Sequence, residues 1–418
     1  GHSYVVDRKT DEKILWRCNK YQIFKCRARI HTSDGMIVKR LQEHNHAGNQ
    51  AKVEATGAIN KIKNMAVNSQ ESSQQIIASV MSELSPAVVG QMPSTSCIKR
   101  TIRHSRNIYD CSPPNPTHLS QLEIPLEYRF THKLELFLIF DNPEAGNDRM
   151  KNLQLLARAK TWYADGTFKV TPSLFCQLYT IHGVMHNDVI PAVFALLPRK
   201  NEETYTKLLQ ELKRHQGQLN PERIMTDFEI AAINGFHTVF PQSQQRGCFF
   251  YFCQCIYRLK YEYENNAEFA LKLRMLSALA FVPTDQIVTS FEALCDSNIL
   301  PPSAQPVIDY VEDNWIGRPD RRAVRRDPRY AHALWNCYED TGENLPKTNK
   351  SCEGWHRSFS SLVSSNHPTL WKFIDKLKDE QGRNEAVIEQ YVAGEDLSPR
   401  KKKYRDAAER LRRVVSDY

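Results

Sequence analysis

The order of the apolar segments between residues 162 and 248 constrains the fold of this chain more than any other pattern in it. Three strand-like stretches come first, with a turn signal at Asn187-Asp188 between the second and the third. A helix, a strand, a helix and a strand follow. The expected ranges are 162–170, 175–185, 189–197, 205–212, 223–226, 228–240 and 245–248. Strands that alternate with helices in this way predict an α/β domain.

Three successive strands followed by helix, strand, helix and strand is the order of a ribonuclease H-like fold. In that fold the first and fourth strands lie side by side and parallel. We expect a strand over 137–140 and a helix over 150–159 before this core, and a helix over 370–391 after it.

Two acidic residues stand near the ends of those two strands. Asp165 lies in an apolar strand, where an unpaired carboxylate is costly unless it binds a cation. Asp227 ends the fourth strand. Two carboxylates on adjacent strands can bridge Mg²⁺ ions about 3.5–4 Å apart. Each also has an ordinary explanation, because Asp165 precedes a glycine, as turn residues do, and Asp227 could be a helix N-cap.

Glu353 is the candidate for a third ligand. It lies off the apolar stripe that Trp355, Phe359 and Leu362 form on its helix, so it could face a cleft. Glu229 is a rival ligand, but its place in a first helical turn is explained by the helix dipole. Glu353 could equally be an ordinary surface acid, and spacing alone does not define a site.

The front of the chain carries two cysteines and two histidines that suit a closed tetrahedral Zn²⁺ site: Cys18, Cys26, His44 and His46. Strand-like segments surround them, with a hairpin turn at Asp34-Gly35. Fewer than 50 residues cannot otherwise form much core, so we expect a small sheet held together by metal. The alternative is two structural cysteines and two surface histidines. The segments around these residues make 4–46 resemble a FLYWCH-type zinc finger, which implies DNA or protein binding.

Three short helices are expected in the next unit, after a polar linker over 47–54. Ile76, Ile77, Val80 and Leu84 have helical spacing, Ser85-Pro86 interrupts, and Ser94 is a possible N-cap of the last helix. The basic side chains of that helix are Lys99, Arg100, Arg103 and Arg106. This pattern suggests a helix-turn-helix with its last helix in a major groove of DNA. A solvated basic face is the alternative.

Charge is unevenly distributed along the chain. Residues 1–107 hold 17 Lys and Arg against 8 Asp and Glu, which favours a polyanion-binding front end on a neutral body.

Between Asp227 and Glu353 lie 125 residues, too many for a loop, so we expect an all-α insertion. Its clustered arginines could grip phosphates or simply be solvated: Arg318, Arg321, Arg322, Arg325 and Arg326. The basic tail suits nuclear import or DNA contact, again unless it is only solvated.

The domain organisation that follows has six parts, with a hinge in the proline-rich segment 112–116. They are a finger (1–50), a helix-turn-helix-like unit (51–110), the first part of the ribonuclease H-like domain (111–260), the insertion (261–345), the last part of the catalytic domain with Glu353 (346–392), and the tail (393–418).

The stretch from Trp162 to about Leu259 resembles the transposase domain of Mutator-like elements. The resemblance rests on Asp165-Gly166-Thr167-Phe168, Thr226-Asp227-Phe228-Glu229, Gly247-Cys248-Phe249-Phe250 and, downstream, Tyr310 to Gly317 and Thr348 to His356. In that family the three acids of a DDE site fall where Asp165, Asp227 and Glu353 stand. The resemblance therefore implies a shared metal site that uses Mg²⁺ or Mn²⁺.

Two positions depart from the family pattern. The family has Cys-x-x-His after the second Asp, whereas here Cys248 is followed by Tyr251. Cys248 and Tyr251 are therefore candidates for supporting the active site. The usual Thr-Asn-Asn ahead of the Glu reads Thr348-Asn349-Lys350. Both departures leave the carboxylates intact.

The expected function is that of a cut-and-paste DNA transposase, an endonuclease and recombination enzyme in the nucleus. The front units would bind the terminal inverted repeats of the element, and the carboxylates would direct strand cleavage and strand transfer into target DNA. Pairing two double-stranded ends implies a homodimer. No apolar run approaches the roughly 20 residues of a membrane span, so no membrane contact is expected. The alternatives are a domesticated transposase that regulates transcription and a plain Mg²⁺-dependent nuclease or resolvase.

Overall fold

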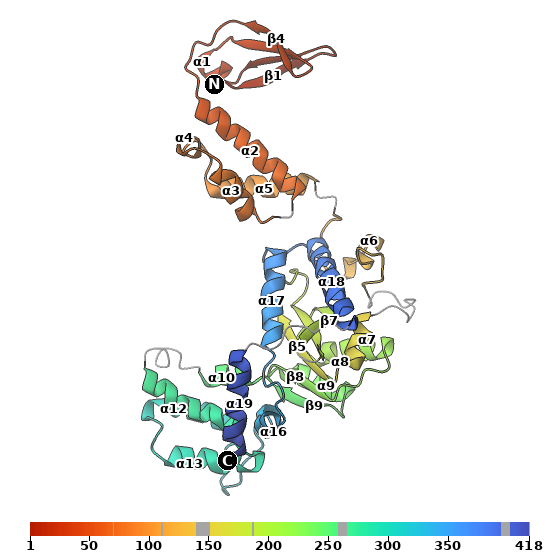
Figure 1. Cartoon of the computed structure of the whole chain (residues 1–418), viewed down its shortest axis with the longest axis vertical. Helices are drawn as coiled ribbons and strands as arrows, with labels where there is room; N and C mark the ends of the chain where they lie inside the picture. Colours follow the sequence, from red (N-terminus) through yellow and green to blue (C-terminus); the bar gives the residue numbers. More distant parts are fainter. Residues whose placement is uncertain are drawn as a thin grey trace. The chain divides into compact units, whose positions relative to one another are not determined.

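The computed structural model describes residues 1–69, 71–109, 112–138, 151–185, 188–257, 266–393 and 402–417. The chain divides into two compact units, Gly1–Pro113 and Pro114–Tyr418, and the division falls in the proline-rich segment 112–116 (Figure 1). The six-part organisation within these units stays a prediction. No helix among the described residues has the length and apolarity of a membrane span.

The first unit begins with a four-stranded antiparallel sheet in the order β1-β2-β3-β4. Its elements are β1 (Tyr4–Lys9), β2 (Ile14–Cys18), α1 (Tyr21–Phe24), β3 (Arg29–Ser33) and β4 (Met36–Leu41). Asp34 and Gly35 both have positive φ and make the β3–β4 turn, as expected. The buried residues at the end of this sheet are only Cys18, Cys26 and Ala28, so the apolar core is very small.

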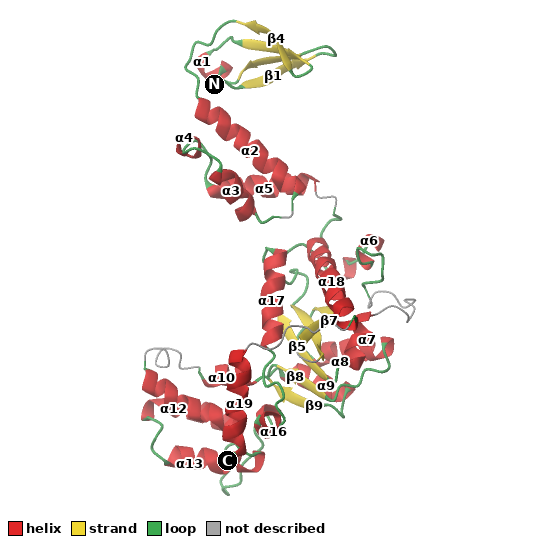
Figure 2. Cartoon of the chain, in the orientation of Figure 1, coloured by secondary structure: helices red, strands yellow, loops and turns green. Residues whose placement is uncertain are grey.

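Four helices complete the first unit (Figure 2): α2 (Gln50–Asn68), α3 (Ser73–Ser82), α4 (Pro86–Val89) and α5 (Thr95–Tyr109). The prediction of a polar linker over 47–54 is wrong from Gln50 onward. The Asn49 side chain accepts from the N–H of Lys52 and caps a 19-residue helix there. Ser94 accepts from the N–H of Cys97 as the expected N-cap of α5. Ile62, Ile76 and Ile98 are fully buried between these helices.

The second unit is built on a five-stranded sheet in the order β7-β6-β5-β8-β9. Its strands are β5 (Thr161–Thr167), β6 (Gln177–Met185), β7 (Asp188–Leu197), β8 (Arg223–Thr226) and β9 (Gln244–Gly247). β5, β6 and β7 are antiparallel neighbours, whereas β8 pairs parallel with both β5 and β9. The predicted parallel pairing of the first and fourth strands is therefore confirmed, and the mixed sheet is consistent with a ribonuclease H-like core.

Helices cover both faces of this sheet. One apolar core joins it to α7 (Lys151–Arg158), α8 (Glu202–His215) and α9 (Ile230–Val239), around Trp162 and Phe236. On the other face, α17 (Lys350–Val363) and α18 (Leu370–Val392) pack around Leu178 and Phe373. Leu178 and Tyr179 point into different cores, which is the alternation that a strand buried on both faces requires.

Two boundaries differ from the prediction. The helix expected from residue 228 begins at Ile230, because Asp227 to Glu229 form the turn after β8. The strand expected over 137–140 is not seen at Phe137 and Leu138, which belong to no strand. Its other half lies outside the described residues. In the described part of the second unit, the helices that precede α7 are η1 (Leu119–Gln121) and α6 (Leu126–Arg129).

The regular secondary structure described between β9 and α17 is helical, apart from an isolated bridge between Pro319 and Arg325. The elements are α10 (Phe249–Ile256), α12 (Ala267–Ala278), η2 (Leu279–Phe281), η3 (Thr284–Gln286), α13 (Ile287–Asp296), η4 (Pro302–Ala304), α14 (Gln305–Val311), the π-helix η5 (Glu312–Ile316), α15 (His332–Trp335) and α16 (Tyr338–Gly342). They share an apolar core around Phe252, Trp315 and Trp335. The tail helix α19 (Lys402–Ser416) packs against α16.

Candidate active site and metal centre

Asp165 and Asp227 are brought together by strand register. β5 and β8 run parallel, and Tyr163 pairs with Met225. Two residues further along each strand come Asp165 and Asp227, so the pairing places the two carboxylates at the same edge of the sheet. Asp165 is 3% exposed, and Asp227 is half-buried just beyond the end of β8.

Glu353 reaches this edge from the first turn of α17. Its neighbour Cys352 is fully buried against Tyr163 of β5 and Met225 of β8, which fixes the start of α17 over both strands. The Glu353 side chain is 18% exposed, and Nη2 of Arg357 lies 3.4 Å from it. The expectation that Glu353 faces a cleft stays a prediction, because the cleft beside Asp227 is lined by other residues.

The electrostatics show that the three acids share one environment. Burial raises the pKa of Asp165 to about 7, and repulsion from Asp227 and Glu353 contributes. Burial, followed by repulsion from Glu229, raises the pKa of Asp227 to about 6. A cation bound between these carboxylates would remove both penalties, so this donor set of oxygen ligands fits a hard divalent ion.

The carboxylates do not form a tight single-ion cluster. Among the described residues, the group of three or more potential ligands whose atoms all lie within 4.8 Å of one another is the cysteine–histidine set, and the three acids are not such a group. When two ions lie a few ångströms apart and one carboxylate bridges them, each of the other two carboxylates binds only one ion. Those two carboxylates therefore need not lie close to each other.

Glu229, the rival ligand, is already engaged. Its carboxylate lies 2.9 Å from Nζ of Lys200 and accepts a hydrogen bond of 2.8 Å from the hydroxyl of Tyr205. The positive charge of Lys200 offsets part of the rise in the pKa of Asp165 and of Asp227. Lys200 is therefore a cation at the site, and the sequence patterns did not identify it.

Tyr251 stands at the carboxylates in the place of the family's histidine. Its pKa is raised by burial and then by the charges of Asp165 and Glu353, with which it shares the site. Cys248 is fully buried at the start of α10, and its N–H donates to the carbonyl of Thr226 at the end of β8. The other departure, Lys350, lies over the ring of Phe250 at 4.4 Å.

A cleft of about 770 Å³ opens beside Asp227 and Tyr251. Its other walls come from the turn after β8 and from the helical insertion, which contributes Tyr310, Asn314 and Arg329. Arg329 is exposed and stacks on Tyr330. Lys200 is paired with Glu229 in this cleft, and Arg329 adds an exposed cation to the lining that Asp227 shares.

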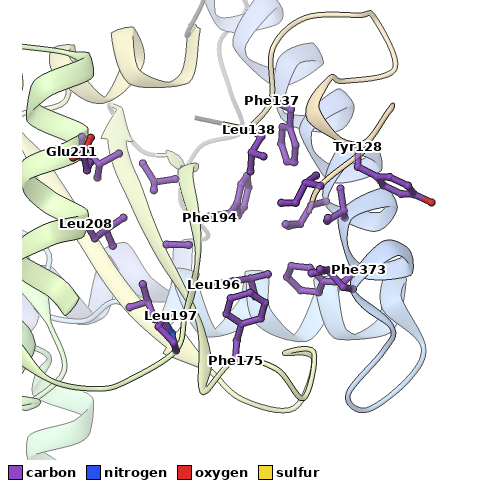
Figure 3. Close-up of a pocket in the computed structure, with 18 of the residues that line it drawn as sticks. Tyr128, Phe137, Leu138, Phe175, Phe194, Leu196, Leu197, Leu208, Glu211 and Phe373 are labelled. Atoms are coloured by element: carbon purple, nitrogen blue, oxygen red, sulfur yellow. The ribbon is translucent and has the colours of Figure 1, made fainter. Parts of the chain in front are cut away.

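A second cavity of about 670 Å³ lies away from the acids (Figure 3). Phe194 and Leu196 of β7 point into it from one side and Phe373 of α18 from another. Its lining is mostly apolar and contains none of the three carboxylates, so we assign it no part in the chemistry.

The cysteine–histidine set forms a compact cluster in the finger. Sγ of Cys18 lies 3.2 Å from Nε2 of His46, and Sγ of Cys26 lies 3.4 Å from Nδ1 of His44. Tetrahedral zinc bonds of about 2.3 Å to sulfur and 2.0–2.1 Å to nitrogen give a sulfur–nitrogen edge of about 3.6 Å, so this group fits Zn²⁺. Sequence patterns did not identify two neighbours: the ring of His2 stacks on His44, and the hydroxyl of Tyr4 lies 2.7 Å from Nε2 of His44.

The predicted DNA-contact residues divide into exposed and engaged side chains. Lys99, Arg100 and Arg103 are exposed on α5. Arg106 instead turns inward and donates to the carbonyls of Ala66, Ser69 and Glu71 after the C-terminus of α2. Its role as a DNA contact is therefore not supported by its geometry.

The arginines of the insertion divide in the same way. Arg325 is paired with Glu292 and Glu312 at 2.8 and 2.9 Å, and Arg318 lies 2.6 Å from Asp313. Arg321, Arg322 and Arg326 are exposed, as is Arg318 despite its ion pair.

The mixed sheet, with acids at the ends of two neighbouring parallel strands, is consistent with a ribonuclease H-like core, and the finger carries a Cys2His2 cluster that fits a metal ion. Comparison with known families makes this specific, because residues 161–255 match the MULE transposase domain and residues 1–46 match the FLYWCH zinc finger domain. The chain thus contains a MULE transposase domain preceded by a FLYWCH zinc finger, and both resemblances inferred from the sequence are confirmed.

Two further comparisons add little to this assignment. No curated protein sequence matches the chain. A solved structure, the Drosophila P element transposase strand transfer complex, is similar over 80% of this chain and 92% of that chain, at 12% identity and a TM-score of 0.28. That score is too low to support an argument, and nothing below depends on it.

Proposed function

We propose that this protein is a DNA transposase that cuts and joins DNA strands at Asp165, Asp227 and Glu353. The observation that carries the proposal is the meeting of two carboxylates at the end of parallel neighbouring strands, with a third supplied by the helix anchored over them. The match to the MULE transposase domain supports it independently.

The residues of the site have separable roles in this proposal. Asp165, Asp227 and Glu353 would hold Mg²⁺ or Mn²⁺, and the bound ions would supply the charge that activates the attacking oxygen and stabilises the leaving oxygen. The N–H of Gly166 donates to Oδ1 of Asp165 at 2.8 Å and limits its rotation. Tyr251 lies beside Asp165 and Glu353, and Lys200 neutralises Glu229. The exposed guanidinium of Arg329 attracts the DNA backbone to the adjoining cleft.

The front unit would deliver the DNA. The zinc-bound finger and the exposed side chains of α5 would bind the terminal inverted repeats of an element, and exposed arginines of the insertion would add phosphate contacts. Action on two ends at once calls for a homodimer, and access to chromosomal target DNA calls for a nuclear location.

The decisive experiment incubates the full chain with candidate element ends, a target duplex and Mg²⁺ or Mn²⁺, and sizes both strands. We expect cleaved ends and end–target joints from the unaltered chain, and neither from Asp165→Asn, which should still bind the ends. Asp285→Asn, at an exposed position in the insertion, is the matched control. Cleavage that survives Asp165→Asn would remove this residue from the site, whereas cleavage without joints would indicate a plain nuclease.

A second candidate function is a domesticated transposase that binds DNA and regulates transcription. Tyr251, in place of the family's histidine, is the observation that favours it. This candidate predicts binding of element ends without cleavage by the unaltered chain, and cleavage that appears in Tyr251→His. Equal cleavage by both proteins would contradict it.

A further inference from the structure

We propose that His356 is a positioning residue that directs an N–H at the carboxylate of Asp165, and that Thr180 and His182 set the direction in which its ring donates. The inference rests on the proposed role of Asp165 as a metal ligand. His356 follows Glu353 by one helical turn on α17, so one helix would bring both a ligand and the group that orients another ligand.

The four side chains form a continuous buried row. Nδ1 of His356 lies 3.6 Å from Oδ2 of Asp165, and its Nε2 lies 3.2 Å from Oγ1 of Thr180. The same Oγ1 lies 2.9 Å from Nε2 of His182. Asp165, Thr180 and His182 are 3%, 0% and 0% exposed, and His356 is 8% exposed, so water does not compete for these contacts.

The positions of the ring and hydroxyl protons determine the direction in which the hydrogen bonds of this row are donated. Nδ1 of His182 is buried with no hydrogen-bond partner among the described residues. A bare lone pair there costs less than a buried N–H without an acceptor, so His182 carries its proton on Nε2 and donates to Thr180. The Thr180 hydroxyl then has one proton to give.

Two acceptors compete for that proton: Nε2 of His356, and the carbonyl of Asp165 at 3.2 Å. When the hydroxyl donates to His356, the proton of the neutral ring must be on Nδ1, which faces Oδ2 of Asp165. Every donor in the row then points toward the carboxylate. Outer partners of this kind fix the orientation of metal-ligating carboxylates. The lone pairs of Asp165 that accept neither from His356 nor from the N–H of Gly166 then remain for metal.

The test measures binding of Mn²⁺ alone to the zinc-loaded full chain without DNA, by electron paramagnetic resonance of the free ion. His356→Gln places its amide near the position of Nε2, so it keeps the contact with Thr180 but loses the donor to Asp165. We expect its Mn²⁺ affinity to fall by about 10- to 100-fold. His356→Asn places its amide nitrogen near Nδ1 and should bind Mn²⁺ nearly as tightly as the unaltered chain.

The outcomes separate this inference from the proposed function. Equal Mn²⁺ affinities for His356→Gln and His356→Asn, whether both normal or both reduced, would overturn the positioning role. If the unaltered chain binds no more Mn²⁺ than Asp165→Asn does, the metal site itself is refuted, and the inference fails with it.

A second pair of variants guards against a folding failure, which circular dichroism would reveal. Thr180→Ser keeps the hydroxyl that sets the His356 ring, whereas Thr180→Val removes it at nearly constant volume. The valine variant should lose Mn²⁺ affinity and the serine variant should not. Equal affinities in this pair would likewise overturn the proposal.

Discussion

Nη1 of Arg223 lies 2.7 Å from Oδ1 of Asp340, and the two side chains are 13% and 2% exposed. Arg223 begins β8, the strand that Asp227 follows, and Asp340 belongs to α16, the last helix before the segment that leads to Glu353. Arg246 of β9 approaches the same carboxylate at 3.4 Å. One buried acid therefore fastens the end of the insertion to the two parallel strands at the sheet edge.

Replacing this acid should be strongly destabilising. Asp340→Asn leaves two largely buried arginines without their counter-charge, and we expect it to lower the free energy of unfolding by about 3–5 kcal/mol. Urea unfolding followed by tryptophan fluorescence would measure this, since five of the six tryptophans lie in the second unit. Glu339→Gln and Glu343→Gln remove only exposed partners of the same arginines and should change stability by less than about 1 kcal/mol. A similarly small effect of Asp340→Asn would show that the ion pair of Arg223 and Asp340 does not hold the insertion against the sheet.

The metal-free protein should become less stable as pH rises from 4 to 7. The pKa of Asp165 is about 7 in the fold and about 3.9 in the unfolded chain, so the folded state holds the extra proton in this range. The cost of ionising the buried group reaches about 4 kcal/mol above pH 7. Urea unfolding of the zinc-loaded, magnesium-free protein at pH 5 and pH 8 measures it, with Asp165→Asn as the reference that lacks this term. Parallel pH profiles for the two proteins would contradict the assignment.

Metal binding should show the same linkage. Because the carboxylates must lose their protons, Mn²⁺ affinity should fall below pH 7, and binding at pH 6 should release protons. Calorimetry in two buffers of different ionisation enthalpy counts those protons. Affinity that stays constant from pH 8 to pH 5.5 would show that Asp165 and Asp227 are not ligands.

Tyr4 should strengthen zinc binding in the finger. Its hydroxyl contacts Nε2 of His44, so it helps hold the ring with Nδ1 toward Cys26 and the metal. We expect Tyr4→Phe to weaken zinc affinity by about 10-fold or more, as measured by competition with a chromophoric chelator. Tyr21→Phe is the control, because it removes a hydroxyl in the same finger from a ring that lies against Arg17 and Arg29. Unchanged affinity in Tyr4→Phe would make its contact incidental.

Substitution of Arg103 should affect DNA binding, whereas substitution of Arg106 should affect stability. Arg103→Ala should weaken binding to element ends and reduce the slope of log affinity against log salt by about 0.9 for each phosphate contact that is lost. Arg106→Ala should instead lower the thermal stability of the first unit, because it leaves carbonyls after α2 without their donor. Fluorescence anisotropy in a salt series and thermal unfolding give the two readouts. The reverse pattern would return Arg106 to the DNA-binding surface.

The predictable parts of this molecule were those in which a local pattern decides the structure. Strand-length apolar runs gave the order of β5 to β9, and the zinc-ligand types in the finger gave a set that the fold does bring together. The start of α2 was not predicted, because its first residues, Gln50 to Glu54, are mostly polar. Only the recognition of Asn49 as the N-cap indicates that these residues are helical.

Other features depend on tertiary contacts that no spacing encodes. Arg106 has the same helical spacing as Lys99 and Arg103, yet only the C-terminus of α2 decides that it turns inward. His356 was visible in the Glu353 motif, but its importance depends on Thr180 and His182, which are far away along the chain. A histidine one helical turn after a candidate ligand was the available signal.

The third carboxylate is carried by a helix that follows the whole insertion. A shortened product ending before Lys350 would keep the finger, α2 to α5, Asp165 and Asp227, yet would lack Glu353. Under the proposed function such a fragment occupies element ends without cutting them. Under the same proposal, a chain that terminates in this interval would compete with the full-length chain for those ends.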